Sequence, residues 1–374
     1  PRPAHTLFLY LLTMYILLMV LKIPWRIAIL GSVAFAFSTY LLIILQVGHN
    51  TKALAIAYIP LVVAGLVLLR QNKLLPGFLV SLLGISLQIR ANHYQMTYYM
   101  LILLAIYIIV YLIDSYKKND LKEYMKYIGV FTVAGILSLG LNAPNILSTY
   151  DYSKYSTRSQ SELKLNPDGT DKEISTGLDY EYITQYSYGI FESINLIAPR
   201  VQGGASSEDI GRNSDLYKFL IDNNVPRNQA DSFVTSVPTY WGDQPILEAP
   251  AYVGISVIFL ATIALFLVKG PLKNGLLLGV IISLLLSWGK NFPLLTDLFI
   301  DYFPLYNKFR AVSSIQVILE FCFPILACMG VYKIFEKREK KNFQYILKIS
   351  AGFVSLLLIF LLSKGFLDFS GPMD

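Results

Sequence analysis

Cysteine and charge are both scarce in this chain of 374 residues. The two cysteines, Cys322 and Cys328, lie in one apolar run at a spacing that matches no common metal-binding or redox motif, so we expect neither a disulfide framework nor a zinc site. Charged residues make up 15% of the sequence and hydrophobic residues 55%. This composition excludes disordered, collagenous and coiled-coil proteins, and also an ordinary soluble globule.

Several catalytic motifs are absent as well. The sequence has no G-x-x-x-x-G-K-[ST], no dinucleotide fingerprint, no H-E-x-x-H and no G-x-S-x-G. We therefore expect no cytosolic nucleotide hydrolysis. The sequence also begins with Pro1 rather than Met, which suggests an internal fragment of a longer protein.

Acidic and basic residues are divided unevenly along the chain. The net charge is +6, yet residues 149–250 contain 15 acidic and 8 basic side chains, so this block is acidic and the remainder is basic. A nucleic-acid-binding protein would present a continuous basic surface, and no groove-reading motif is present. We expect no nucleic acid among the partners.

Long apolar runs make up most of the remaining sequence. A helix needs roughly 20 predominantly apolar residues to cross a bilayer, and about ten stretches approach that length. They are residues 5–21, 27–46, 53–69, 75–89, 97–113, 127–148, 251–268, 274–288, 312–332 and 346–363. The sequence therefore predicts an all-α polytopic membrane protein, with about six transmembrane helices in 1–148 and about four in 251–374.

Lys and Arg residues in the short loops concentrate on one predicted face, which the positive-inside rule assigns to the cytoplasm. That face collects Lys22, Arg26, Arg70, Lys73, Lys117, Lys118, Lys122, Lys126, Lys269, Lys273, Lys333, Lys337, Arg338, Lys340, Lys341 and Lys348. The other face has Arg2, Lys52, Arg90, Lys290, Lys308, Arg310 and Lys364. We therefore expect a bacterial cytoplasmic (inner) membrane protein whose residues 149–250 form an extracytoplasmic acidic domain, or a large loop, of mixed structure.

Two loops on the predicted outer face carry histidine and asparagine. His49 and Asn50 follow the second segment, and Asn92 and His93 follow the fourth. Ordinary polar loops would have the same composition, but imidazole and amide groups beside a cation also suit an anionic ligand. A zinc ion held by His49 and His93 is a third interpretation, which no ligand spacing supports.

Lys290, Lys308 and Arg310 lie in the loop before the ninth segment. Lys308 and Arg310 are two residues apart, so an extended backbone would place them on one side, and the helix that follows adds positive potential at its N-terminus. These cations are candidates for binding phosphate or pyrophosphate. Snorkelling toward lipid headgroups is the alternative.

Acidic residues supply the other candidates. Asp243 follows Trp241 closely, a combination that suits a sugar because aromatic rings stack on sugars and a carboxylate accepts their hydroxyl protons. An interfacial turn with an aromatic anchor is the alternative. Glu320 falls inside the ninth segment, where an ionisable side chain is either functional or bonded to a neighbouring helix.

Four stretches of the sequence have a recognisable order and spacing. They are residues 35–50, which end in Gly48-His49-Asn50, residues 91–99, Tyr240-Trp241-Gly242-Asp243-Gln244-Pro245, and residues 306–311. Together they resemble the YfhO family of bacterial multi-pass membrane proteins, in its Bacteroidetes form. The resemblance covers the whole chain and implies that it is the middle of a longer protein.

The resemblance implies a glycosyltransferase of the C superfamily, which moves a sugar from a polyprenyl-phosphate donor to an acceptor outside the cytoplasmic membrane. The implied partners are a lipid-linked sugar donor, an envelope glycan or polymer acceptor, and membrane lipids. In such families the catalytic acid usually lies in the first external loop, which would precede Pro1. Within this chain, Asp243 is left as the catalytic or secondary acid. Arg310, Lys308 and Lys290 would bind the donor phosphate, and the substrate-site candidates are His49, Asn50, Asn92, His93 and Trp241.

Other properties stay open at this stage. A divalent cation cofactor is one, since the sequence offers no ligand set. A flippase or transporter of a lipid-linked or anionic solute would use the outward cations as an entry site and interrupted helices near the midplane. A non-catalytic envelope scaffold would tolerate the loss of these cations and of Asp243. The size of the acidic block favours an enzyme.

Overall fold

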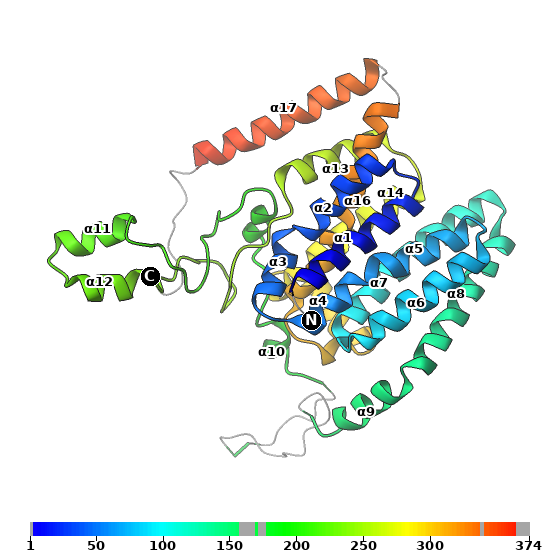
Figure 1. Ribbon diagram of the computed structural model, residues 1–374, viewed down its shortest axis with the longest axis horizontal. Helices are drawn as coiled ribbons and strands as arrows, with labels where there is room; N and C mark the ends of the chain where they lie inside the picture. The colour runs from blue at the N-terminus through cyan, green and yellow to red at the C-terminus, as the bar shows by residue number, and fades with distance from the viewer. Residues whose placement is uncertain (1–2, 157–168, 171–176, 337–339, 364–374) are drawn as a thin grey trace.

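The computed structural model describes residues 3–156, 169–170, 177–336 and 340–363, and it is built from helices (Figure 1). The main helices are α1 (Pro3–Val20), α2 (Trp25–Ala36), α3 (Thr39–Gln46), α4 (Asn50–Ala57), α5 (Ile59–Arg70), α6 (Leu74–Arg90), α7 (Tyr94–Lys118), α8 (Leu121–Leu141), α13 (Ile255–Leu267), α14 (Pro271–Ser287), α16 (Val317–Glu336) and α17 (Lys340–Ser363). Among the described residues there is no strand, and a single isolated bridge pairs Glu208 with Val237.

Six helical stretches are long and apolar enough to cross a membrane. They are Pro3–Val20, Asn50–Arg70, Tyr94–Lys118, Leu121–Leu141, Val312–Glu336 and Phe343–Ser363. A seventh would be the pair α2 and α3, which is bent by 48°. Several helices of this chain are therefore suited to a bilayer, as the composition predicted.

Each of the ten predicted segments coincides with a helix or with two successive helices, but not all of them reach spanning length. The second segment is divided at the α2–α3 bend, and the fourth, seventh and eighth correspond to the shorter helices α6, α13 and α14. The sixth ends early, because α8 stops at Leu141 and Pro144 begins a separate helix, α9 (Ala143–Ser153). The number of ten crossings stays a prediction.

Helix α16 lies at the centre of the bundle. Its side chains are buried from Val317 through Leu326 with the exception of Phe323, and it packs against α2, α13 and α14. Helices α5 and α6 form a second close pair, in which the Cα of Gly65 faces the backbone of Ser81. Small residues at such positions let two helix backbones approach, which is a common source of stability in apolar surroundings.

The bend between α2 and α3 places a polar contact inside the bundle. Ser38 leaves the helical conformation (φ −55°, ψ 135°), and its hydroxyl donates a 2.5 Å hydrogen bond to Oε2 of Glu320. Both side chains are buried, with Glu320 at 0% exposure. The carboxyl group therefore has a partner on a neighbouring helix, one of the two alternatives that the sequence left open for Glu320.

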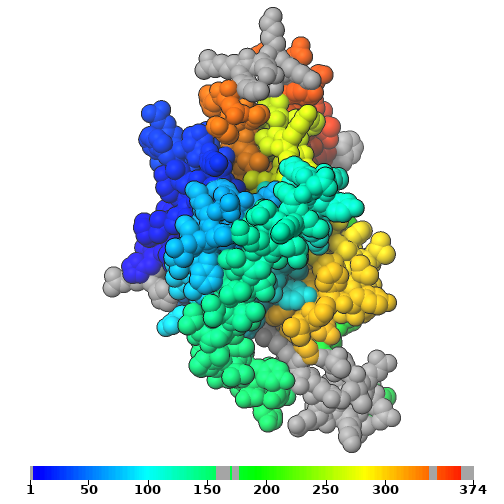
Figure 2. Space-filling view, turned by 90° about the vertical axis from the view of Figure 1, so that its right-hand side faces the viewer, coloured from blue at the N-terminus to red at the C-terminus, as the bar shows by residue number. Residues whose placement is uncertain are grey.

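The described residues between α8 and α13 lie at one end of the bundle. The described part contains α9, α10 (Tyr180–Thr184), η1 (Phe191–Leu196), α11 (Asp215–Asp222), α12 (Arg227–Val234) and irregular loops. Figure 1 shows α11 and α12 as a hairpin that projects away from the bundle, and Figure 2 shows α8 followed by α9 along one face. A separate domain over 149–250 with mixed secondary structure stays a prediction.

The two ends of the bundle carry different connections. The α3–α4 and α6–α7 connections lie at one end (Figure 1). The α14–α15 connection contains Asn291, whose side-chain amide donates a 3.3 Å hydrogen bond to the Asp243 carboxylate, and we name this the Asp243 end. The α1–α2, α7–α8 and α13–α14 turns lie at the other, which we name the Lys22 end (upper right in Figure 1). The alternation predicted from the sequence thus brings its outer-face loops to the same end.

Candidate functional site

Residues 177–188 lie across the Asp243 end and tie its loops together. Their backbone pairs with the segment between α14 and α16, which contains η2 (Gly289–Asn291), α15 (Pro293–Tyr302), η3 (Tyr306–Lys308) and η4 (Val312–Gln316). The hydrogen bonds are Leu178 N–H to Asn307 O (3.0 Å), Ala311 N–H to Ile183 O (3.1 Å), Ser313 N–H to Tyr186 O (3.2 Å) and Tyr188 N–H to Ser287 O (2.8 Å). The segment that includes α10 is therefore fixed to the bundle rather than free above it.

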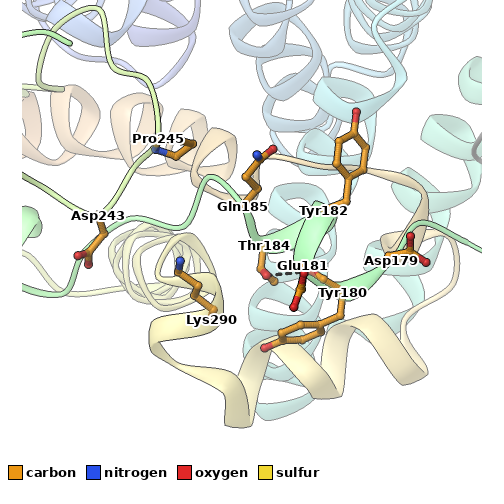
Figure 3. A pocket seen from close by; sticks show the side chains of 9 residues that line it. All are labelled: Asp179, Tyr180, Glu181, Tyr182, Thr184, Gln185, Asp243, Pro245 and Lys290. Atoms are coloured by element: carbon orange, nitrogen blue, oxygen red, sulfur yellow. Dashed lines mark hydrogen bonds between the residues drawn. The ribbon is translucent and has the colours of Figure 1, made fainter. Parts of the chain in front are cut away.

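A cavity of about 770 Å³ opens at this end (Figure 3). Its lining residues are Asp179, Tyr180, Glu181, Tyr182, Thr184, Gln185, Asp243, Pro245 and Lys290. We name it the Asp243 cavity. It unites two of the predicted site residues, Asp243 from the loop before α13 and Lys290 from η2, with a wall supplied by α10. A volume of this size holds a sugar with part of its carrier.

The loop that carries Asp243 is anchored by a buried glutamate. Glu192 is 0% exposed and accepts hydrogen bonds from the Tyr240 hydroxyl (3.0 Å), the Gln244 side-chain amide (3.0 Å) and the backbone N–H of Gly189 (3.0 Å). The Tyr240 hydroxyl accepts a further bond from the backbone N–H of Gln244 (2.9 Å). Asp243 lies between these two residues, so its position depends on Glu192.

Burial is the main cause of a shifted pKa at Glu192. It raises the pKa of the carboxyl group, and the nearby Asp243 carboxylate adds to the rise, while the three hydrogen bonds oppose it. A buried acid beside an exposed one is an arrangement found at functional sites and also in structural networks. Glu192 does not line the cavity, so its role is to position the Asp243 loop.

The three predicted phosphate-binding cations are not equivalent. Lys290 is exposed and lines the cavity. Arg310 is also exposed; it donates a 2.6 Å hydrogen bond to the Tyr182 hydroxyl and stacks over its ring at 5.1 Å, so it contacts a lining residue without lining the cavity itself. Lys308 ends η3, so the stretch Tyr306–Arg310 is not continuously extended, although Phe309, which follows Lys308, has an extended backbone (φ −114°, ψ 143°).

None of the predicted substrate-site residues is among those that line this cavity. His93 caps α7 by accepting the Met96 N–H at 3.4 Å, and Asn92 adopts a left-handed backbone (φ 57°) that asparagine tolerates well. His49 and Asn50 are exposed at the start of α4. Trp241 lies in the loop that carries Asp243, and its backbone N–H donates to the carbonyl oxygen of Gln202 (3.2 Å).

Sequence reasoning did not single out several residues that the structure places here. Tyr180 and Tyr182 supply aromatic faces to the cavity, and their alternate spacing with Asp179 and Glu181 was the available signal. Lys52, which sequence reasoning placed only among the outward cations, is half-buried, donates to the Ser314 hydroxyl (3.0 Å) and lies over the Tyr40 ring at 5.4 Å. No sequence pattern marks Glu192, because nothing in the adjacent sequence predicts that its side chain is buried.

A salt bridge braces the loop on the other side of Asp243. Arg200 binds Glu208 through both guanidinium nitrogens at 2.7 and 2.8 Å, and the Thr239 hydroxyl also donates to Glu208. These bonds, led by the one from Arg200, lower the pKa of Glu208 to about 2. Residues 200–208 are thereby fixed to the strand-like stretch that leads into the Asp243 loop.

Metal ligands are not gathered in the described part of the chain. There, no group of three or more His, Cys, Asp or Glu side chains is arranged to hold a metal ion. His49 and His93 lie on different helix termini, and Cys322 and Cys328 are free and buried in α16. The side chains described here provide no ligand set for the divalent cation that the sequence left open.

Comparisons with other proteins give no further guide. No protein-family model, no curated protein and no solved structure matches this chain. The functional argument therefore rests on the geometry of the Asp243 end.

Proposed function

We propose that this protein is a membrane glycosyltransferase that moves a sugar from a polyprenyl-phosphate donor to an envelope glycan or polymer. In this proposal ten segments cross the bacterial cytoplasmic membrane, and the Asp243 end with residues 149–250 faces outward. The resemblance to the YfhO family and the excess of Lys and Arg at the Lys22 end support this orientation.

One observation carries the proposal: a carboxylate and an ammonium group line the same cavity at the end of an apolar helix bundle. A lipid-linked donor has an apolar tail, an anionic phosphate and a polar sugar. Its binding site therefore needs an apolar surface, a cation and a sugar-binding surface next to one another. The bundle offers the apolar one, Lys290 the cationic one, and Asp243 with Tyr180 and Tyr182 the sugar-binding one.

The chemistry assigned to these residues is a single displacement. The acceptor hydroxyl attacks the anomeric carbon of the donor sugar, and its proton passes to the Asp243 carboxylate. The bond between the anomeric carbon and the phosphate oxygen breaks, which releases polyprenyl phosphate. Lys290 neutralises the charge on that leaving group, with Arg310, which is hydrogen-bonded to Tyr182, as a second cation.

The test uses the full-length protein in membrane vesicles and follows radiolabelled sugar from polyprenyl-phosphate donors to endogenous acceptors. Asp243→Asn should reduce transfer by about 10²–10⁴-fold while donor binding persists, because only the proton acceptor is removed. Lys290→Gln should weaken donor binding by about tenfold, because one charge-assisted contact to phosphate is lost.

Two matched variants separate this effect from a general loss of charge. Asp222→Asn changes an exposed carboxylate on α11, and Lys117→Gln an exposed lysine at the Lys22 end; both should transfer sugar normally. Unchanged transfer in Asp243→Asn and Lys290→Gln would refute the assignment. Wild-type protein that transfers no sugar, with all variants functional in cells, would favour an envelope scaffold.

The α2–α3 bend supports a second candidate, a flippase or transporter of a lipid-linked or anionic solute. Interrupted helices with a buried ionisable residue are a feature of transporters, and here the break at Ser38 contacts Glu320. Label that crosses the bilayer without a new glycosidic product, and stops crossing in Glu320→Gln, would make this the better interpretation.

A further inference from the structure

A second large cavity, of about 700 Å³, lies at the Lys22 end, opposite the Asp243 cavity. It is formed by the α1–α2 turn, the α13–α14 turn and the last residues of α16, which meet at the upper end of the bundle in Figure 1. Its lining residues are Leu21, Lys22, Ile23, Leu267, Val268, Lys269, Leu272, Met329, Tyr332, Lys333 and Glu336. We name it the Lys22 cavity.

The Lys22 cavity has an excess of positive charge. Lys22, Lys269 and Lys333 line it with one acid, Glu336, which forms an ion pair with Lys333 at 2.5 Å. Neither Lys22 nor Lys269 forms an ion pair with another residue among those that the structure describes. Both ammonium groups line the same cavity, so an anion bound there would be attracted to both.

The position of Lys22 is fixed by the backbone. Lys22 has a left-handed conformation (φ 61°) and donates its N–H to Met19 O (3.0 Å), while Ile23 N–H donates to Leu18 O (3.0 Å). These two backbone hydrogen bonds end α1 in the manner of a helix C-terminal cap. The lysine therefore projects from a rigid turn, and it also lines an adjoining hollow of about 330 Å³ that contains Lys73.

Apart from Tyr332, the remaining walls are apolar. They are made by Leu21, Ile23, Leu267, Val268, Leu272 and Met329. A small hydrated anion gains nothing from such walls, whereas the glycerol and first methylene groups of a phospholipid are stabilised by them. The cavity also lies where helices suited to a bilayer end, which is the depth of lipid headgroups.

We propose that the Lys22 cavity binds an anionic phospholipid, whose phosphate lies between Lys22 and Lys269 and whose glycerol contacts the apolar walls. The bound lipid would join three turns that are distant in the sequence, and so stabilise the bundle at this end. This site is independent of the transferase proposal.

The test measures lipid retention by native mass spectrometry and thermal unfolding of the full chain in detergent, with phosphatidylglycerol, phosphatidylcholine or inorganic phosphate added. Wild-type protein should retain phosphatidylglycerol and unfold at higher temperature with it. The double variant Lys22→Gln, Lys269→Gln should bind it about tenfold or more weakly, since each lysine near a membrane surface contributes to anionic-lipid affinity.

A matched double variant, Lys117→Gln, Lys122→Gln, removes two exposed lysines from the α7–α8 turn at the same end. It carries the same charge change and should bind phosphatidylglycerol as the wild type does. Lys22→Arg, Lys269→Arg should also bind, which distinguishes a lost contact from a damaged fold. Equal loss in both glutamine variants would overturn the proposal, and so would equal stabilisation by inorganic phosphate or by phosphatidylcholine.

Discussion

At the residue scale, Glu192 and Glu208 hold the loop that presents Asp243. Glu192 is buried and joined to Tyr240 and Gln244, whereas Glu208 is partly exposed and joined to Arg200. Their pKa values are shifted in opposite directions, because burial raises the pKa of Glu192 and the hydrogen bond from Arg200 lowers the pKa of Glu208.

Glu192→Ala should destabilise the protein by about 2–3 kcal/mol, because it leaves the Tyr240 hydroxyl and the Gln244 amide buried without their acceptor. Thermal unfolding and limited proteolysis within 240–244 would measure this. Glu181→Ala removes an exposed glutamate from the cavity wall and should leave both readouts unchanged. Equal stability of the two variants would contradict the anchoring role of Glu192.

Glu208 should contribute to stability at neutral pH and lose that contribution in acid. Its pKa is lowered from 4.5 to about 2 in the folded state, so the stabilisation is present above pH 4.5 and declines as pH falls toward 2. Glu208→Gln should have a lower unfolding temperature at pH 7 and a smaller decline between pH 5 and about 3. Parallel pH profiles for wild type and variant would show that the ion pair is not responsible.

At the element scale, the α5–α6 pair depends on a glycine. A Cβ at Gly65 would lie 2.6 Å from the backbone nitrogen of Ser81, and backbone cannot move aside as a flexible side chain can. On α8, by contrast, Gly129 has nothing within 4 Å of that position. The two glycines therefore occupy a tight helix interface and an open helix face.

Gly65→Leu should separate α5 from α6 and cost about 3 kcal/mol or more, because overpacking at a helix contact is not relieved by side-chain movement alone. Gly129→Leu makes the same substitution on the open face and should be tolerated. Monodispersity in detergent and unfolding temperature would measure both. If the two variants behave alike, the α5–α6 contact is not as close as described.

At the scale of the whole molecule, the two ends of the bundle have different chemistry. The Asp243 end combines acidic loops with a sugar-sized cavity, and the Lys22 end is lined by lysines. In the proposed orientation these ends lie on opposite sides of one membrane. Sugar transfer would then take place on one side of the membrane, and the anionic phospholipid would bind on the other.

Cysteine labelling would test this orientation. The native Cys322 and Cys328 are buried, so they provide little background. Asn223→Cys, at the end of α11, should react with a membrane-impermeant maleimide in intact cells. Lys117→Cys should react only after permeabilisation, and the reverse pattern would invert the proposed topology.

The helical class and the approximate position of the apolar helices could be predicted from the sequence alone, whereas the face to which each loop belongs stays a prediction. These properties depend on local composition and on the alternation of successive helices, which a single sequence displays. It also selected Asp243 and Lys290, because a carboxylate or a cation in an external loop is visible without knowing its neighbours.

Contacts between residues that are distant in the sequence depend on the folded structure. Ser38 contacts Glu320 across 282 positions, and Lys52 contacts Ser314 across 262, so no local pattern could pair them. No local pattern pairs Glu192 with its partners either, because Tyr240 and Gln244 lie in a loop that is distant in the sequence. Periodicity reports which face of an element is buried, whereas the identity of the neighbour depends on how separate elements pack, and that is a property of the folded molecule.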